Sequence, residues 1–262
     1  MTVEEALRSS GIDPREARLL LARVTGFSEA SVLAFPERAL PEEHEARFVE
    51  HACRRRKGEP VAYILGEKEF YGLRLAVNPA VLVPRPETEL LVDLALQRDF
   101  SSALDLGTGS GAIALAVKRN RPDARVVAVD ASAAALVVAK RNADALGLDV
   151  EWRHGEWFDA VGGERFDIVL SNPPYVASDD PHLADLRHEP PSALVSGPEG
   201  LDAIRDIART ASGHLKPQGW LFLEHGIRQD AAVRSLLQGA GLEDVQTWPD
   251  LAGIPRVSGG RA

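Results

Sequence analysis

Four consecutive residues in the middle of the chain, Asn172-Pro173-Pro174-Tyr175, combine an amide, two rigid prolines and an aromatic ring. Each proline pushes the preceding residue into an extended conformation and contributes no N–H, so fixed carbonyl oxygens dominate the segment. The Asn172 side-chain oxygen and the Pro173 backbone oxygen can together accept both hydrogens of a planar –NH₂ group, while Pro174 and Tyr175 pack on its faces. Such a site selects an amide or an exocyclic amine over an ammonium, which needs three acceptors.

A planar amide nitrogen is a poor nucleophile because its lone pair is delocalised. Acceptors that hold both of its hydrogens draw electron density onto the nitrogen and aim it at an electrophile. Orientation of this kind can contribute several of the ~7–11 kcal/mol that alignment supplies in the best cases. We therefore expect Asn172, Pro173 and Tyr175 to act in catalysis, and all four residues of the segment to bind the substrate.

A glycine-rich turn lies upstream, in the stretch LDLGTGSGAIALAV at residues 104–117. Gly107, Gly109 and Gly111 let the backbone turn tightly and let a ligand approach without interference from Cβ atoms. Asp130 ends the next predicted strand, about 20 residues further on, where an acid can accept both ribose hydroxyls of an adenosine-type ligand. The strand, the turn, the following helix and the spaced acid together predict a nucleoside cofactor.

Two cofactors fit this turn. Gly107, Gly109 and Ala112 match the G-x-G-x-x-A form that binds the pyrophosphate of NAD, whereas Gly107, Gly109 and Gly111 match the G-x-G-x-G form of S-adenosylmethionine-binding folds. Asp105, in the strand before the turn, favours the second, because a carboxylate attracts the amino group of a methionine but repels a pyrophosphate. Hydride transfer would also need a His or Lys in the Asn-Pro-Pro-Tyr segment, which has neither. The pattern favours methyl transfer from S-adenosyl-L-methionine, whose sulfonium methyl is the electrophile.

From residue 103 onward, short apolar runs alternate with helical stretches, which predicts a mostly parallel, doubly wound α/β sheet. The predicted strands cover residues 103–107, 125–130, 150–154, 166–171 and 219–225, and the predicted helices cover 111–120, 132–146, 199–214 and 227–240. Two final strand-like pieces, LEDVQTW and PRVSGGR, have no helix between them and predict an antiparallel hairpin. Because neighbouring strands are parallel, Gly107, Asp130 and Asn172 should meet at one sheet edge, where ligands bind.

An aromatic pair follows the third of these strands. Glu156, Trp157 and Phe158 lie where the adenine of a bound ligand would be expected, and an aromatic ring such as that of Trp157 can pack on a purine. The alternative is an ordinary core tryptophan.

The chain before residue 87 has a different pattern of residue types. Residues 1–67 are helical in pattern, with Pro14 and Pro41 opening two helices, and they predict a small helical domain. Residues 68–86 are rich in β-branched and aromatic side chains and predict a β-hairpin linker, with Asn78-Pro79 as a turn. Residues 87–262 then form the cofactor-binding domain.

Charge and composition exclude several classes of protein. The net charge is −9, with 12 Lys and Arg against 13 Asp and Glu up to residue 83 and 18 against 26 beyond it. The acidic second part is a poor surface for nucleic acid, so direct nucleic-acid binding is not expected. The single cysteine, Cys53, excludes an internal disulfide framework. The sequence contains no run of ~18 apolar residues, so it predicts no membrane span. We expect a cytoplasmic protein without a metal site.

Three stretches, NPPY, DLGTGSGAIAL and VLVPRPETELLV, together resemble the HemK/PrmC family, which methylates the glutamine side-chain amide of the Gly-Gly-Gln motif in peptide chain release factors. The resemblance runs from about Gly58 to the C-terminus, where PVAYILGEKEFYG and HEPPSAL also match, and is looser over residues 1–57. It implies a class I methyltransferase domain with protein-(glutamine-N5) activity. It also implies that the helical domain at residues 1–67 helps to hold the release factor.

The resemblance also implies roles for individual positions. Cofactor contacts are implied for Gly107, Thr108, Gly109, Ser110, Gly111, Asp130, Trp157 and Asn172, and glutamine contacts for Asn172, Pro173, Pro174 and Tyr175. Glu156 stands where an Asp is expected, and the roles of Arg85 and Glu87 in the PRPETE stretch stay open. Segments of the NPPY type also serve methylases of adenine N6 in DNA and guanine N2 in ribosomal RNA, so a nucleic-acid base is the alternative substrate. The acidic charge favours a basic protein partner.

Overall fold

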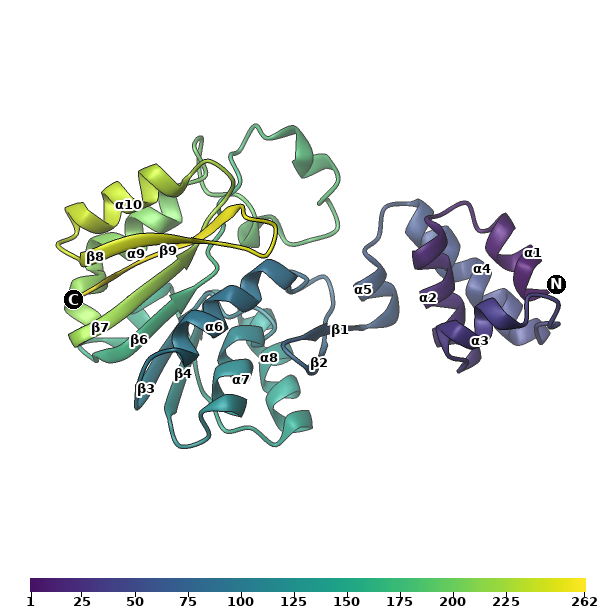
Figure 1. Ribbon diagram of the computed structural model, residues 1–262, viewed down its shortest axis with the longest axis horizontal. Helices are drawn as coiled ribbons and strands as arrows, with labels where there is room; N and C mark the ends of the chain where they lie inside the picture. Colours follow the sequence, from purple (N-terminus) through teal and green to yellow (C-terminus); the bar gives the residue numbers. More distant parts are fainter. The chain divides into compact units, whose positions relative to one another are not determined.

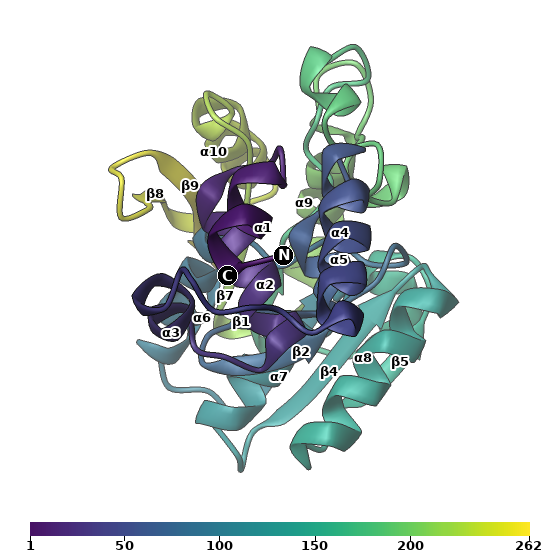
Figure 2. The same cartoon turned by 90° about the vertical axis from the view of Figure 1, so that its right-hand side faces the viewer.

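The computed structural model describes all 262 residues, which form two compact units, Met1–Glu67 and Lys68–Ala262. The first unit is built from helices (Figure 1 and Figure 2), which are α1 (Val3–Ser9), α2 (Pro14–Thr25), α3 (Glu29–Ala34), α4 (Glu42–Arg56) and α5 (Val61–Leu65). The ends of α2 follow from local chemistry: Asp13 accepts the N–H groups of Arg15 and Glu16, and Gly26 ends the helix at φ +74°.

The second unit alternates strands and helices along the chain. The strands are β1 (Glu67–Phe70), β2 (Leu73–Ala76), β3 (Ser102–Leu106), β4 (Arg125–Asp130), β5 (Glu151–His154), β6 (Phe166–Ser171), β7 (Leu215–Glu224), β8 (Glu243–Pro249) and β9 (Pro255–Arg261). The α-helices are α6 (Glu89–Leu96), α7 (Ala112–Asn120), α8 (Ala133–Leu146), α9 (Asp202–His214) and α10 (Asp230–Gly239). Four 3₁₀ turns complete the unit, η1 (Pro86–Thr88), η2 (Trp157–Val161), η3 (Pro181–Ala184) and η4 (Pro191–Ala193).

Seven strands form one sheet in the order β5-β4-β3-β6-β7-β9-β8. The first five are parallel, and β9 runs antiparallel to both β7 and β8. The predicted doubly wound sheet with an antiparallel C-terminal hairpin is therefore confirmed. The strand order reverses between β3 and β6, and ligands of such sheets bind beyond the carboxyl ends of the strands at that point.

Helices cover both faces of this sheet (Figure 1). Alternate residues of the central strands point to opposite faces, so Ala103, Ile168 and Leu170 pack in one core with α6 and α7, while Leu104 and Val169 pack in the other with α9 and α10. Because both faces are buried, the strands are apolar almost throughout, which explains why they were recognisable as continuous apolar runs.

The segment before α6 forms a small two-stranded sheet, β1 and β2, followed by an irregular stretch. Asn142 on α8 fixes its end, because the Asn142 side chain accepts from the N–H of Ala76 and donates to the Ala76 carbonyl at 2.7 and 3.0 Å. No helix of the structure is both long and apolar enough to cross a bilayer.

Candidate active site

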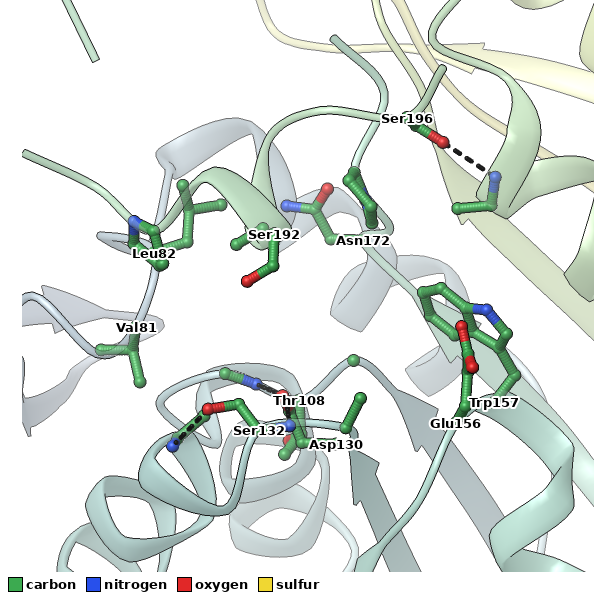
Figure 3. A pocket seen from close by; sticks show the side chains of 18 of the residues that line it. Val81, Leu82, Thr108, Asp130, Ser132, Glu156, Trp157, Asn172, Ser192 and Ser196 are labelled. Atoms are coloured by element: carbon green, nitrogen blue, oxygen red, sulfur yellow. Dashed lines mark hydrogen bonds between the residues drawn. The ribbon is translucent and has the colours of Figure 1, made fainter. Parts of the chain in front are cut away.

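A cavity of about 610 Å³ lies at the carboxyl edge of β3, β4 and β6 (Figure 3), a volume within the range of sites for small molecules. Eight of the residues predicted to form the site line it: Gly107, Thr108, Gly109, Ser110, Asp130, Trp157, Asn172 and Pro174. The structure does not place Gly111, Pro173 or Tyr175 in this lining. Parallel strand order explains the grouping, since each lining loop follows a strand that ends at the same edge.

The glycine loop turns from β3 into α7 with Gly107, Gly109 and Gly111 at φ values of +72°, +57° and +84°. These values are unfavourable for residues that carry a Cβ atom. Gly111 faces the protein interior, where an added Cβ would lie 3.1 Å from the side chains of Leu115 and Trp152. Gly109 is different, because an added Cβ would meet nothing within 4 Å. Gly111 therefore serves packing, and Gly109 borders open space.

The backbone donors of this loop are largely used within the protein. The N–H groups of Gly107 and Thr108 both donate to the Val129 carbonyl, and the Gly109 N–H donates to Asp130 Oδ2 at 2.8 Å. A pyrophosphate site needs several free N–H groups pointing at the anion. The loop therefore fits a ligand that needs close approach and van der Waals contact better than it fits a dinucleotide.

Asp130 sits at the end of β4 with both carboxylate oxygens held by the backbone. Oδ2 accepts from Gly109, and Oδ1 accepts from the N–H of Ser132 at 2.8 Å. Each oxygen keeps a second lone pair, so the carboxylate can still accept two hydroxyl groups from a ligand. Burial raises its pKa, while the two backbone hydrogen bonds and nearby His154 oppose that rise.

Asp105, the acid that favoured a methionine tail in the sequence, lies beneath the loop and does not line the cavity. Its Oδ2 accepts from the Thr108 hydroxyl at 2.6 Å and from the Ala114 N–H at 3.2 Å, whereas Oδ1 is buried without a partner. Burial raises the pKa of this carboxyl to about 7, against the lowering effect of Thr108 and Ala114. Asp105 therefore acts on the cavity through the Thr108 side chain, and a cationic group nearby would stabilise its charge.

Trp157 forms one wall of the cavity (Figure 3). Its backbone adopts φ +42°, unusual for an aromatic residue, and its indole lies against Gly107, where an added Cβ would be 3.4 Å from the ring. The neighbouring Phe158 instead is buried and stacks on His214 at 4.4 Å between ring centroids. Trp157 therefore forms a wall of the cavity, whereas Phe158 belongs to the core.

The carboxamide of Asn172 is anchored at one end only. Its Nδ2 donates to the Thr88 hydroxyl oxygen at 3.1 Å, and Oδ1 accepts no hydrogen bond from the protein. Asn172 lines the cavity (Figure 3) and Thr88 is buried. The side chain is thus held so that a hydrogen-bond acceptor is available to a ligand.

Beyond Asn172 only part of the segment lies at the cavity. Pro173 is buried, Pro174 lines the cavity, and the Tyr175 hydroxyl donates to Glu224 Oε1 at 3.1 Å at the end of β7. Gln229 donates to the Tyr175 carbonyl at 3.1 Å and fixes the backbone there. The substrate contacts of Pro173 and Tyr175 stay predictions, and the tyrosine ring has a clear second role as a partner of a buried carboxyl group.

Three polar side chains that were not predicted to belong to the site hydrogen-bond to residues in or beside it: Thr88, Glu189 and Glu224. Glu189 is buried and accepts from the N–H of Val83 at 3.0 Å and from Arg85. This clamp joins the PRPETE and HEPPSAL stretches, whose positions in the sequence gave no sign that they meet. Of the three, Glu224 could have been noticed in the sequence as a candidate site residue, because it is an acidic residue at the end of an apolar strand.

Two family models match the chain. The model of the methyltransferase small domain matches residues 86–238, and the model of the PrmC N-terminal domain matches residues 2–66. Solved structures with the same fold include a 16S rRNA N2 G1207 methyltransferase from T. thermophilus, solved with AdoMet and guanosine, with a TM-score of 0.56 and 23% identity over 74% of this chain and 49% of that one. A methyltransferase from Pyrococcus furiosus also has a TM-score of 0.56, with 17% identity over 84% of this chain and 98% of that one.

Curated relatives share much more of the sequence. A release factor glutamine methyltransferase from Burkholderia pseudomallei is 47% identical over 99% of this chain and 96% of its own length. The enzymes of the same name from Neisseria gonorrhoeae and Xylella fastidiosa are 48% and 56% identical, over 100% and 79% of this chain and 98% and 78% of their own lengths. The similarity to these enzymes thus extends along the whole chain, and this protein belongs to the release factor glutamine methyltransferase family.

Proposed function

We propose that this protein transfers a methyl group from S-adenosyl-L-methionine to the side-chain amide N5 of the glutamine in the Gly-Gly-Gln motif of peptide chain release factors. The observation that carries the proposal is the state of Asn172: its carboxamide is anchored through Nδ2 and offers Oδ1 at the cavity. An acceptor fixed at that place suits a planar –NH₂ group, which has hydrogens to donate and a lone pair to direct.

The cavity suits the proposed cofactor in three respects. Gly109 leaves space against which a ligand can pack, Asp130 retains acceptor capacity for two ribose hydroxyls, and Trp157 presents an aromatic wall. Asp105 is buried with Oδ1 unpartnered, and a cationic cofactor bound nearby would favour its ionised form. The cofactor would supply the electrophilic methyl group and leave as S-adenosylhomocysteine when its S–CH₃ bond breaks, and the N–H proton that the amide loses on methylation would pass to water.

The residues of the chain then orient the substrate. Asn172 Oδ1 accepts one hydrogen of the glutamine amide, and the Pro173 carbonyl is the proposed acceptor of the other. Pro174 contributes a rigid apolar surface to the same cavity. Holding the amide in this way favours the geometry in which its nitrogen faces the methyl group, and orientation accounts for the rate.

Peptide chain release factors are the proposed partners, and the charge of the chain supports a protein substrate. The residues beyond 83 carry 18 Lys and Arg against 26 Asp and Glu, so a basic loop is attracted and a nucleic-acid backbone is repelled. The helical unit Met1–Glu67 is the proposed second contact for the release factor.

Methyl transfer from radiolabelled S-adenosylmethionine to purified release factor tests the proposal directly. The label should appear on the glutamine of the Gly-Gly-Gln motif and should be lost when that glutamine is replaced by alanine. Label on DNA or ribosomal RNA, with none on the release factor, would assign the chain to a nucleic-acid methylase instead.

Asn172→Ala separates binding from catalysis in the same assay. We expect cofactor affinity, measured by titration calorimetry, to fall only modestly while turnover falls by at least about 100-fold, because the lost oxygen orients the nucleophile. Turnover close to that of the wild type would remove the proposed role of Asn172.

A further inference from the structure

The carboxamide of Gln229 joins three loops at the carboxyl edge of the sheet. Its –NH₂ group donates to three carbonyl oxygens, those of Tyr175 and Glu199 at 3.1 Å and that of Gly200 at 3.3 Å. Its Oε1 accepts from the Gly226 N–H at 2.7 Å. The three loops follow β6, precede α9 and follow β7. We propose that Gln229 is a positioning residue that holds the Asn-Pro-Pro-Tyr segment in the geometry that methyl transfer requires.

The side chain of Gln229 does not serve its own helix. Gln229 occupies the position before α10, where Ser, Thr, Asp or Asn commonly accepts a hydrogen bond from the first turn, but the Gln229 side chain makes no such bond. A carboxamide offers both an acceptor and two donor protons, and here both ends bind other loops. The helix therefore does not account for a glutamine at this position.

The two prolines make their neighbours important. Pro173 and Pro174 have no N–H, so neither donates a backbone hydrogen bond, and the place of their carbonyls depends on the end of β6 and on Tyr175. Tyr175 is held twice, through its hydroxyl by Glu224 and through its carbonyl by Gln229. The first bond holds the aromatic ring, whereas the second holds the backbone beside the prolines. Since the Pro173 carbonyl is the proposed acceptor for the substrate amide, this inference rests on the proposed function.

A second backbone contact of the segment has a different reach. The Val176 N–H donates to the Leu194 carbonyl at 2.8 Å, and the Val176 carbonyl accepts from the Ser196 N–H at 2.9 Å. Both partners belong to the same connection between β6 and α9, so this pairing joins two parts of one loop. Gln229 lies outside that connection, at the start of α10, and therefore fixes the segment relative to the rest of the domain.

Two glycines allow the loops to approach Gln229 and Tyr175 closely. Gly200 adopts φ +70°, and a Cβ added there would overlap the Tyr175 carbonyl group. A Cβ added at Gly226 would lie 2.9 Å from Gln229 Oε1 and 3.4 Å from the Tyr175 ring. Larger residues at either position would separate the groups that the carboxamide joins.

Nuclear magnetic resonance can measure the bond to the Tyr175 carbonyl without any turnover. The sequence has three tyrosines, and only Tyr175 is followed by a valine, so carbonyl-¹³C tyrosine with ¹⁵N valine gives one Tyr175–Val176 correlation from the full chain. A carbonyl carbon is deshielded when its oxygen accepts a hydrogen bond. We therefore expect this ¹³C signal to move upfield in Gln229→Met, which retains the length of the side chain. Gln238→Met, at an exposed position on the same helix, should leave the signal in place.

Kinetics provide the second readout. Gln229→Met and Gln229→Glu should each lower kcat by about 10-fold or more, because small displacements of orienting groups are costly to the rate. The cofactor Kd and KM should stay within about threefold, since Gln229 does not line the cavity. Gln229→Glu retains the size and the acceptor of glutamine but places an oxygen against the carbonyls of Tyr175 and Glu199. It therefore tests the –NH₂ group itself.

Asn142 supplies a matched control for general loss of structure. Its carboxamide likewise joins loops, because it donates to the carbonyls of Ala76 and Ser110 and accepts from the Ala76 N–H. Ser110 belongs to the glycine loop, so Asn142→Leu should raise the cofactor Kd while kcat at saturating cofactor stays within about threefold. The two variants should thus have opposite effects on Kd and kcat.

The outcomes are distinguishable. An unmoved Tyr175 signal in Gln229→Met, or wild-type kcat in either Gln229 variant, would overturn the positioning role even if the enzyme methylates release factors as proposed. A fall in kcat of the same size in Asn142→Leu would also overturn it, by attributing the effect to general loss of structure. Absence of methyl transfer by the wild type would instead overturn the proposed function, and the Tyr175 signal would still decide whether Gln229 holds the segment.

Discussion

Arg85 and Glu189, which lie 104 positions apart in the sequence, form an ion pair whose carboxylate side chain is only 3% exposed. Glu189 also accepts the backbone N–H of Val83, so one buried side chain joins the segment before α6 to the loop after β6. Both segments line the cavity, through Leu82 and Pro84 on one side and Pro190 on the other. The clamp therefore determines how far these two walls stand apart.

Arg85→Ala should destabilise the protein because it leaves a buried carboxylate without its partner. We expect a loss of about 1–3 kcal/mol in the free energy of unfolding and a weaker affinity for S-adenosylmethionine. Arg85→Ala combined with Glu189→Gln should recover part of the stability, since the neutral amide no longer needs a cation. Urea denaturation and calorimetry measure the two quantities, and strictly additive effects would contradict direct coupling.

Asp130→Asn should weaken cofactor binding by at least about 10-fold. The carboxylate accepts from both Gly109 and Ser132, and an asparagine –NH₂ in its place would face a backbone N–H instead of accepting it. It would also lose acceptor capacity for a ribose hydroxyl. Titration calorimetry checks this, with Asp123→Asn on the exposed surface as the matched control. A Kd within twofold of the wild type would exclude the proposed role of Asp130.

Alanine substitutions in the glycine loop should have different effects at different glycines. Gly111→Ala places a Cβ 3.1 Å from Leu115 and Trp152 and 3.2 Å from Ala139 in a left-handed conformation, so we expect a loss of about 2 kcal/mol or more in stability. Gly109→Ala meets no protein atom within 4 Å, so its main effect should be on cofactor affinity. Thermal unfolding and calorimetry on both variants test the distinction, which fails if Gly109→Ala is the less stable of the two.

The pH dependence of stability should report on Glu224. Burial raises the pKa of this carboxyl to about 7, while Thr88, Tyr175 and Arg256 lower it and Glu87 raises it further. The folded state therefore binds a proton more tightly than the unfolded state, so this contribution to stability is full below pH ~4.5 and is lost as the pH rises through about 7. Glu224→Gln removes the loss, and its stability relative to the wild type should increase by about 2 kcal/mol between pH 5 and 8.

Local pattern was sufficient for much of the fold. The strand predicted at residues 166–171 coincides with β6, because buried parallel strands are apolar on both faces and stop at a polar or proline residue. The strand predicted at residues 219–225 instead begins at Leu215, which pairs with Phe166 before the regular pairing of β6 and β7 starts at Trp220. A short exposed stretch of that kind carries no apolar run, so its pairing is visible only in the assembled sheet.

By itself, the sequence determined the parallel sheet, the glycine loop, the acid at the end of the second sheet strand and the Asn-Pro-Pro-Tyr segment, because each is encoded within a few consecutive residues. Only the tertiary structure decided what surrounds them. Three side-chain contacts each join positions that lie tens of residues apart in the sequence: Asn172 with Thr88, Tyr175 with Glu224, and Arg85 with Glu189. The physical reason is that a hydrogen bond to a buried polar group depends on which chain segments meet in space, and no local pattern of residue types records that meeting.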